Sequence, residues 1–170
     1  PFGLLKNTFS VFPGEIVSFD KYGKLGKKRF WNFPKFNNSN MNYTDAKNAI
    51  ESEIQESVKE QLISDVPIGA FLSGGVDSPL ICKYAINYLL SDFNTFSIGS
   101  NSVTHDETYK STQYAQALNT RHHIETMTAR TSIDYLDEIL YNAGEPIGDS
   151  SIIPAWKLSS MASSKVTVIL

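Results

Sequence analysis

The sequence predicts an α/β protein in which helices cover both faces of a parallel β-sheet, preceded by a short β-hairpin. From residue 68 onward, short apolar runs alternate with segments of helical periodicity. This alternation is typical of parallel strands joined by helical crossovers. A loop rich in glycine and serine follows the first of these strands, at the edge where such sheets bind ligands.

Residues 1–36 differ from the rest of the chain. EIVSFD (15–20) and KRFWNF (28–33) predict two short strands. The lysine- and glycine-rich stretch around their junction indicates an exposed hairpin turn rather than a nucleic-acid-binding patch. An asparagine-rich segment (33–43) then indicates a linker, and we place a domain boundary near residue 37.

Residues 37–170 form the second predicted domain. Apolar residues recur every four positions over 44–63 and predict a helix, with Thr44 as its N-cap. Asp106 is expected to cap a later helix and Gly144 to end another. The remaining predicted elements are strands at 68–73, 94–99, 122–127 and 166–170, and helices at 79–90, 107–118, 132–143 and 154–163.

Composition limits the possible classes of protein. The net charge of −3 argues against a dedicated nucleic-acid binder, and no apolar run approaches the roughly 18 residues that a membrane span needs. The single cysteine, Cys82, suits a reducing compartment such as the cytoplasm, and we expect it in the core. Because the chain starts at Pro1 and ends within an apolar run, we expect a part of a longer protein.

The segment SGGVDS (73–78) carries the strongest chemical signal. Glycines let a backbone approach a ligand closely or adopt positive φ, and a helix start offers free N–H groups to an anion such as phosphate. Ser73 and Ser78 can donate O–H bonds to phosphate oxygens. Asp77 would repel a phosphate unless a cation lay between them, so it implies Mg²⁺. The sequence contains neither a Walker A nor a dinucleotide-binding glycine motif.

This segment resembles the S-G-G-x-D-S pyrophosphate loop of the ATP pyrophosphatases. SDVPIGAFLSGGVDSPLI, TFSIG, HDETYKSTQYAQALNTRHH and GEPIGDSSIIPAWKLSSMASSKVTVIL resemble successive blocks of the glutamine-dependent asparagine synthetases. VFPGEIVSFDKYGKLGKKRFWNF resembles the connector from that family's glutaminase domain. The resemblance implies an adenine nucleotide alpha hydrolase-like fold, with 1–36 ending the glutaminase domain and 37–170 forming a truncated synthetase domain.

The resemblance also implies an activity, with ATP and Mg²⁺ as cofactors. The carboxylate of aspartate attacks ATP, giving β-aspartyl-AMP and pyrophosphate. Ammonia, which the glutaminase domain of the same parent chain releases from glutamine, then displaces AMP and leaves asparagine. By position, Leu72 and Ile98 would flank the adenosine. The implied pyrophosphate-binding residues are Ser73, Gly74, Gly75, Asp77 and Ser78, of which Asp77 would also be catalytic and hold Mg²⁺ through the pyrophosphate.

Some residues allow more than one interpretation. Asp149 could hold substrate or Mg²⁺, or cap the next helix, and we favour the cap. Asp106 and Glu107 indicate a helix start rather than a site. Pro79 replaces the more usual serine and removes one N–H donor. The family's second Ser-Gly-acidic loop, its downstream lysine and its N-terminal cysteine nucleophile are absent from the sequence, so we expect the chain to be inactive alone.

Two alternatives stay open. Relatives that act on other acceptors, such as amidotransferases and β-lactam synthetases, share the same loop. The chain could also be a nucleotide-binding module without catalysis. The sequence predicts no nucleic-acid or membrane partner and leaves the oligomeric state undetermined.

Overall fold

The computed structural model describes residues 3, 5–35, 40–89, 93–101, 106–144 and 146–170. The chain divides into two compact units, residues 1–41 and 42–170, and each is described by itself. The expected boundary at residue 37 lies outside the described residues, as do parts of the expected linker. Within the described residues, no helix is long and apolar enough to cross a membrane.

The first unit contains an antiparallel hairpin of β1 (Glu15–Phe19) and β2 (Leu25–Arg29). The carboxylate of Asp20 accepts hydrogen bonds from two backbone N–H groups of the turn, at 2.8 and 2.9 Å, and Gly23 adopts φ 79°. This tight turn sets the register. The predicted second strand (28–33) was therefore placed too late, because pairing starts directly after the turn and ends at Arg29.

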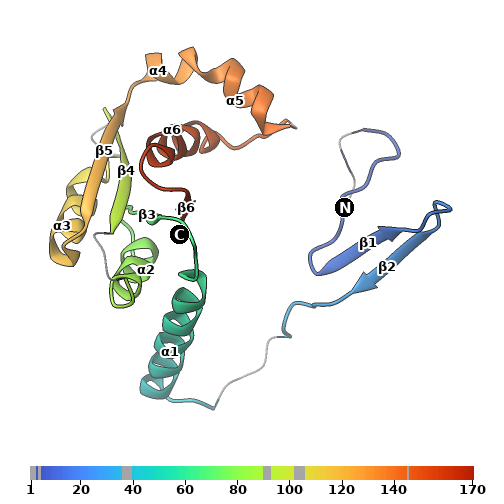
Figure 1. Ribbon diagram of the computed structural model, residues 1–170, viewed down its shortest axis with the longest axis horizontal. Helices are drawn as coiled ribbons and strands as arrows, with labels where there is room; N and C mark the ends of the chain where they lie inside the picture. Colours follow the sequence, from blue (N-terminus) through green and yellow to red (C-terminus); the bar gives the residue numbers. More distant parts are fainter. Residues whose placement is uncertain (1–2, 4, 36–39, 90–92, 102–105, 145) are drawn as a thin grey trace. The chain divides into compact units, whose positions relative to one another are not determined.

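The second unit carries all the other elements (Figure 1). Its four described strands form one parallel sheet in the order β5-β4-β3-β6. Every predicted strand and helix of this unit overlaps an observed one. The elements are α1 (Tyr43–Gln61), β3 (Ile68–Phe71), α2 (Asp77–Ala85), β4 (Asn94–Ser100), α3 (Thr108–Leu118), β5 (Arg121–Met127), α4 (Ala129–Asp134), α5 (Leu136–Ala143), α6 (Ile152–Ser163) and β6 (Val168–Ile169).

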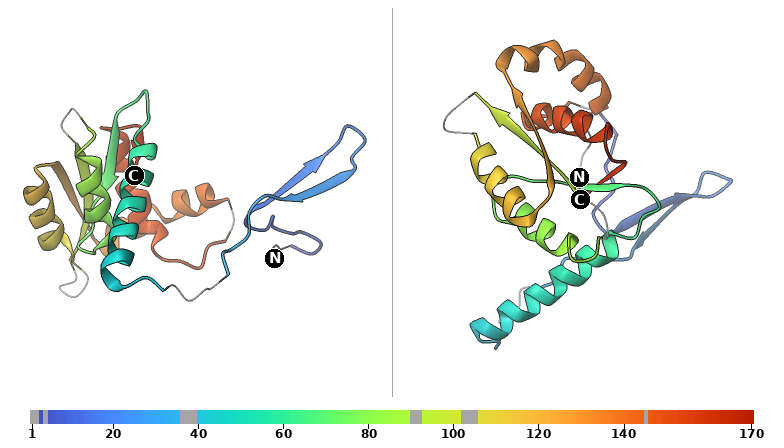
Figure 2. Two further views of the ribbon diagram at one scale, coloured as in Figure 1. Left: turned by 90° about the horizontal axis from the view of Figure 1, so that it is seen from below. Right: turned by 60° about the vertical axis from the view of Figure 1, so that its left-hand side comes forward.

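Helices cover both faces of this sheet. Helices α2 and α3 lie on one face, with α1 packed on α2, and α6 lies on the other (Figures 1 and 2). The predicted fold class is therefore confirmed. Strand order reverses at β3, since β4 and β5 extend the sheet on one side and β6 lies on the other. The carboxyl end of β3 is consequently the place where a sheet of this kind binds ligands.

Side chains of β3 and of Leu72, the residue after it, alternate between two hydrophobic clusters. Ala70 and Leu72 pack toward α1, α2 and α3, whereas Phe71 packs with the fully buried Phe96 against α6. Cys82 of α2 is also fully buried, as predicted. Burial raises the pKa of its thiol to about 12, because an apolar surrounding disfavours the thiolate.

Two helix boundaries differ from the prediction. The side chain of Asn42, rather than Thr44, caps α1 by accepting the N–H of Asp45 at 2.9 Å. The single helix predicted over 132–143 is two helices, α4 and α5, separated at Tyr135, whose backbone leaves the helical region (φ −104°, ψ 0°). Gly144 ends α5 with φ 75°, as expected for a left-handed helix end.

Candidate nucleotide-binding site

The loop between β3 and α2 is held together by its own serines. Ser73 donates its backbone N–H to the hydroxyl oxygen of Ser78 at 2.8 Å, and the two hydroxyl oxygens lie 2.9 Å apart. Gly75 donates its N–H to the hydroxyl oxygen of Ser73 at 3.2 Å. The two serines expected to contact phosphate therefore also fix the shape of the loop.

Gly74 serves close approach rather than unusual backbone geometry. The possibility of positive φ raised for this loop is not realised, because neither Gly74 nor Gly75 has a left-handed backbone. A Cβ on Gly74 would instead lie 3.0 Å from the Cβ of Glu107 and 3.1 Å from that of Lys110. Gly74 therefore lets the loop lie against the start of α3.

Glu107 is the site residue that the sequence interpretation missed. Gly74 donates its backbone N–H to Oε2 of Glu107 at 2.8 Å. Asp106 does not take the N-cap position that we expected, because the N-cap of α3 is Glu107. The carboxylate of Asp106 lies just before it and accepts the N–H and the hydroxyl of Thr108 at 3.1 and 3.0 Å. These hydrogen bonds hold the pKa of Asp106 below its usual value. The acidic pair was visible in the sequence, but nothing local indicated that Glu107 reaches the loop.

Helix α2 begins at the exposed Asp77, and no side chain caps it. Its first turn therefore presents N–H groups and a partial positive charge next to the loop. Pro79 lies buried in this first turn, where a missing N–H is tolerated. These features suit an anion placed against residues 73–78.

Asp77 is the candidate magnesium ligand. Within the part of the chain that the structure describes, no group of three or more histidine, cysteine, aspartate or glutamate residues could hold a metal ion. Mg²⁺ commonly uses one or two carboxylates and completes its shell with phosphate oxygens and water. The carboxylate of Asp77 at the start of α2 fits an ion shared with a phosphorylated ligand, and does not fit a metal site made of protein alone.

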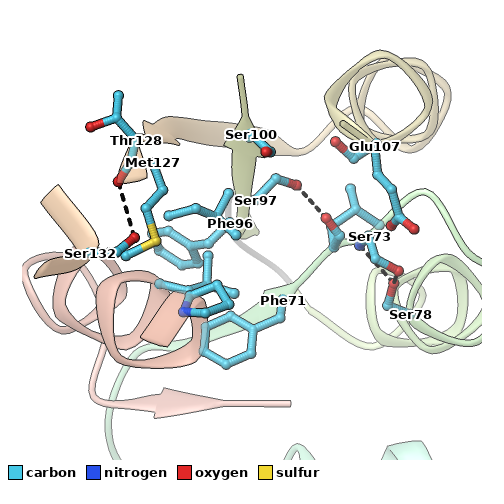
Figure 3. A pocket seen from close by; sticks show the side chains of 16 residues that line it. Phe71, Ser73, Ser78, Phe96, Ser97, Ser100, Glu107, Met127, Thr128 and Ser132 are labelled. Carbon is cyan, nitrogen blue, oxygen red and sulfur yellow. Dashed lines mark hydrogen bonds between the residues drawn. The ribbon is translucent and has the colours of Figure 1, made fainter. Parts of the chain in front are cut away.

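A cavity of about 780 Å³ opens beside the loop at the carboxyl ends of β3 and β4 (Figure 3). Of the expected site residues, Leu72, Ser73, Ser78 and Ile98 line it, and Glu107 extends from α3 toward the two serines. Gly74, Gly75 and Asp77 belong to the adjoining loop and helix start. The lining residues are Phe71, Leu72, Ser73, Ser78, Phe96, Ser97, Ile98, Gly99, Ser100, Glu107, Ser111, Met127, Thr128, Ser132, Pro154 and Leu158.

The two halves of the cavity differ in chemistry. Phe71, Phe96 and Met127 gather in one half, with Thr128 and Ser132 beside Met127, and the serines of the loop lie in the other half (Figure 3). A ligand with a flat apolar part and an anionic tail matches this arrangement. Leu72 is fixed within the sheet, since its N–H donates to the carbonyl of Phe96 at 2.8 Å and its carbonyl accepts the hydroxyl of Ser97.

Asp149 does not cap α6 as we favoured, because the N-cap is Ser151 and no side chain caps this helix. Its Oδ1 accepts the backbone N–H of Ser151 at 2.9 Å, directly before α6. Hydrogen bonds from Ser151 hold the pKa of Asp149 below its usual value. Asp149 is not among the residues that line the cavity.

The parallel sheet and the S-G-G-x-D-S loop at its carboxyl edge define a nucleotide-binding α/β domain of the pyrophosphate-loop class. Residues 49–170 match the family model described as asparagine synthase. The chain therefore belongs to the asparagine synthase family, and the resemblance seen in the sequence is confirmed.

Individual relatives agree with this assignment. The chain is 33% identical over its whole length to "Putative asparagine synthetase [glutamine-hydrolyzing] 2" of Methanocaldococcus jannaschii, and covers 33% of that protein. It is 31% identical to asparagine synthetase [glutamine-hydrolyzing] 1 of Bacillus subtilis over 71% of this chain and 19% of that protein. The chain thus spans a third or less of these relatives.

Among solved structures, an NH3-dependent NAD synthetase from Campylobacter jejuni matches with a TM-score of 0.47 and 18% identity, over 76% of this chain and 56% of that one.

Proposed function

We propose that this chain supplies the ATP-binding part of a site that amidates aspartate to asparagine. The reaction would form β-aspartyl-AMP and pyrophosphate, and ammonia derived from glutamine would then displace AMP. The observation that carries this proposal is the SGGVDS loop at the carboxyl end of β3, next to a cavity with one apolar and one polar half.

In this proposal each part of ATP lies against residues of matching polarity. Leu72 and Ile98 would flank the adenosine, its base would reach toward the apolar half, and the phosphates would reach the loop. The N–H of Leu72 is already used within the sheet and its side chain is buried in the core, so adenosine contacts at Leu72 come from the second lone pair of its carbonyl oxygen.

The loop would act on the leaving group. Negative charge grows on pyrophosphate as the bond to the α-phosphorus breaks, and fixed donors aimed at that charge lower the barrier. One of the hydroxyls of Ser73 and Ser78 donates to the other. The remaining O–H and the first-turn N–H groups of α2 would be such donors. Asp77 would hold Mg²⁺ against the phosphate oxygens, where the ion neutralises charge.

The wider assignments are part of the same proposal. Residues 1–36 would end a glutaminase domain of the same parent chain, and residues 37–170 would begin the synthetase domain. Aspartate, ATP and ammonia from glutamine would be the reactants, and the cytoplasm the location. The relatives' names, which include glutamine hydrolysis, support glutamine as the source of ammonia.

The test uses the protein that contains this chain, with ATP, Mg²⁺ and aspartate. We expect AMP and pyrophosphate to form only when aspartate is present. Formation of ADP and phosphate would overturn the proposal. Turnover with a different acceptor in a panel of carboxylic acids, or tight ATP binding with no turnover, would favour the two alternatives.

A pair of matched variants tests the loop itself. Asp77→Asn should weaken Mg²⁺-dependent ATP binding about tenfold, equivalent to about 1.4 kcal/mol. Asp149→Asn, which removes a carboxylate engaged at a helix start, should leave binding within about twofold, a difference below about 0.5 kcal/mol. Equal effects of the two substitutions would remove Asp77 from the site.

A further inference from the structure

The contact between Gly74 and Glu107 places an anion on the loop. The carboxylate of Glu107 accepts the N–H of Gly74 at 2.8 Å across 33 positions of sequence. This is the geometry of a charge-assisted hydrogen bond between a backbone N–H and an anionic oxygen. Glu107 also lines the cavity beside Ser73 and Ser78 (Figure 3). A protein carboxylate therefore occupies a position where the loop could bind a phosphate.

The surroundings hold this contact in place. Asp106 fixes the backbone just before α3 through its two hydrogen bonds to Thr108. Gly74 has no side chain, so its N–H can come close to α3, where a Cβ would lie 3.0 Å from the Cβ of Glu107. The close approach and the hydrogen bond together connect the loop to the start of α3.

Phosphate and Glu107 would compete for this donor. One N–H makes one strong hydrogen bond, and two anions at the same donor also repel each other. No cationic side chain forms an ion pair with Glu107 among the described residues. A phosphate that binds the Gly74 N–H must therefore displace the carboxylate.

We propose that Glu107 is a positioning residue that holds the loop while no ligand is bound and competes with phosphate for the Gly74 N–H. The proposal rests on the proposed function, because it concerns the phosphates of ATP or pyrophosphate at the same loop. Binding of these ligands would then move the Glu107 side chain away from Gly74. The competition lowers affinity for phosphates and keeps the empty loop ordered.

The first experiment measures affinity for inorganic pyrophosphate and for ATP, with and without Mg²⁺, by calorimetry. Glu107→Gln keeps a hydrogen-bond acceptor and removes the charge, so we expect binding about fivefold tighter without Mg²⁺, based on the loss of one like-charge repulsion. Glu60→Gln, on an exposed position of α1, removes the same charge and serves as the control. Weaker Mg²⁺-dependent binding in Glu107→Gln would make Glu107 a metal ligand and overturn the proposal.

The second experiment needs no nucleotide. Hydrogen exchange of the Gly74 amide, followed by NMR in the unliganded protein, should accelerate in Glu107→Ala. The Ser73 amide, which is bonded to Ser78 within the loop, should change much less. Equal acceleration at both amides would mean that the loop has lost its structure, and no change at Gly74 would mean that the contact is absent. Either result would overturn the proposal.

The two proposals can fail separately. If wild-type protein and variants bind neither ATP nor pyrophosphate, the proposed function is wrong and the competition is wrong with it. If all bind with equal affinity and Gly74 exchange is unaffected, only the role of Glu107 is wrong.

Discussion

The glycines at positions 74 and 75 are adjacent, yet the structure predicts that substitution by alanine destabilises the protein only at position 74. At Gly74, an added Cβ would meet the Cβ atoms of Glu107 and Lys110 at 3.0 and 3.1 Å and the carbonyl oxygen of Glu107 at 3.3 Å. At Gly75, the single contact within 4 Å is the hydroxyl oxygen of Ser73, at 3.3 Å. We therefore expect Gly74→Ala to be harmful and Gly75→Ala to be nearly neutral.

The magnitude follows from what must move. The atoms facing Gly74 belong to the backbone and the Cβ positions of α3, which cannot rotate away as the tip of a long side chain can. Overpacking of this kind costs about 1–3 kcal/mol. The displaced loop also loses alignment of the bond from Gly74 to Glu107. At Gly75, a small shift of one hydroxyl suffices, and an exposed substitution without strain changes stability by about 0.5 kcal/mol or less.

Urea unfolding followed by circular dichroism measures the difference. With a slope of about 2 kcal/mol/M, a loss of about 2 kcal/mol lowers the midpoint of Gly74→Ala by about 1 M. The midpoint of Gly75→Ala should move by about 0.25 M or less, by the same relation. The reasoning is refuted if Gly75→Ala destabilises the protein as much as Gly74→Ala does.

Three further predictions concern two buried side chains and one half-buried histidine. Ser97→Ala should cost about 1–3 kcal/mol in unfolding free energy, because it removes a buried hydroxyl that donates to the carbonyl of Leu72. Cys82 should resist alkylation at pH 8 until the protein unfolds, because burial raises the pKa of the native thiol to about 12. Burial lowers the pKa of His122 below 6.5 in the folded state, so its contribution to stability should be lost as the pH falls below 6.5. His122→Asn, which can keep a hydrogen bond to Thr95, should reduce this acid sensitivity.

A specific result would contradict each of these three predictions. A Ser97→Ala variant as stable as wild type would mean that the hydroxyl makes no net contribution. Rapid modification of Cys82 in the native protein, at the rate seen in urea, would contradict its burial in α2. An unchanged pH dependence of the unfolding midpoint in His122→Asn would assign acid sensitivity to another group.

The parallel sheet could be predicted from the sequence because the patterns that indicate its strands are local. Alternation of apolar and helical segments fixed the strands from residue 68 onward, and the S-G-G-x-D-S motif fixed the edge that carries the site. In the hairpin, local strand propensity did not predict the position of the second strand. The aromatic residues at 30–33 favour a strand, but the turn held by Asp20 pairs β1 with 25–29 instead.

Glu107 could not be predicted for a different reason. Its carboxylate reaches Gly74 only because α3 packs beside the loop, and no pattern within either segment encodes that proximity. The break at Tyr135 is similar, since no glycine or proline marks it. The start of α4 could have been predicted from Thr128 and Thr131, whose side chains cap the helix reciprocally. This capping starts α4 at Ala129, before the position 132 that periodicity predicts.

The strand order has a consequence for how the chain acquires its structure. During synthesis, β3 gains its first neighbour once β4 has emerged, but its second edge stays open until Val168 and Ile169 are made. Pairing over such a long stretch of sequence closes a large loop and is slow. Among the described strands, β3 therefore gains its second neighbour only after β4 and β5 have paired, and a nascent chain would expose this edge to non-native pairing until β6 is made.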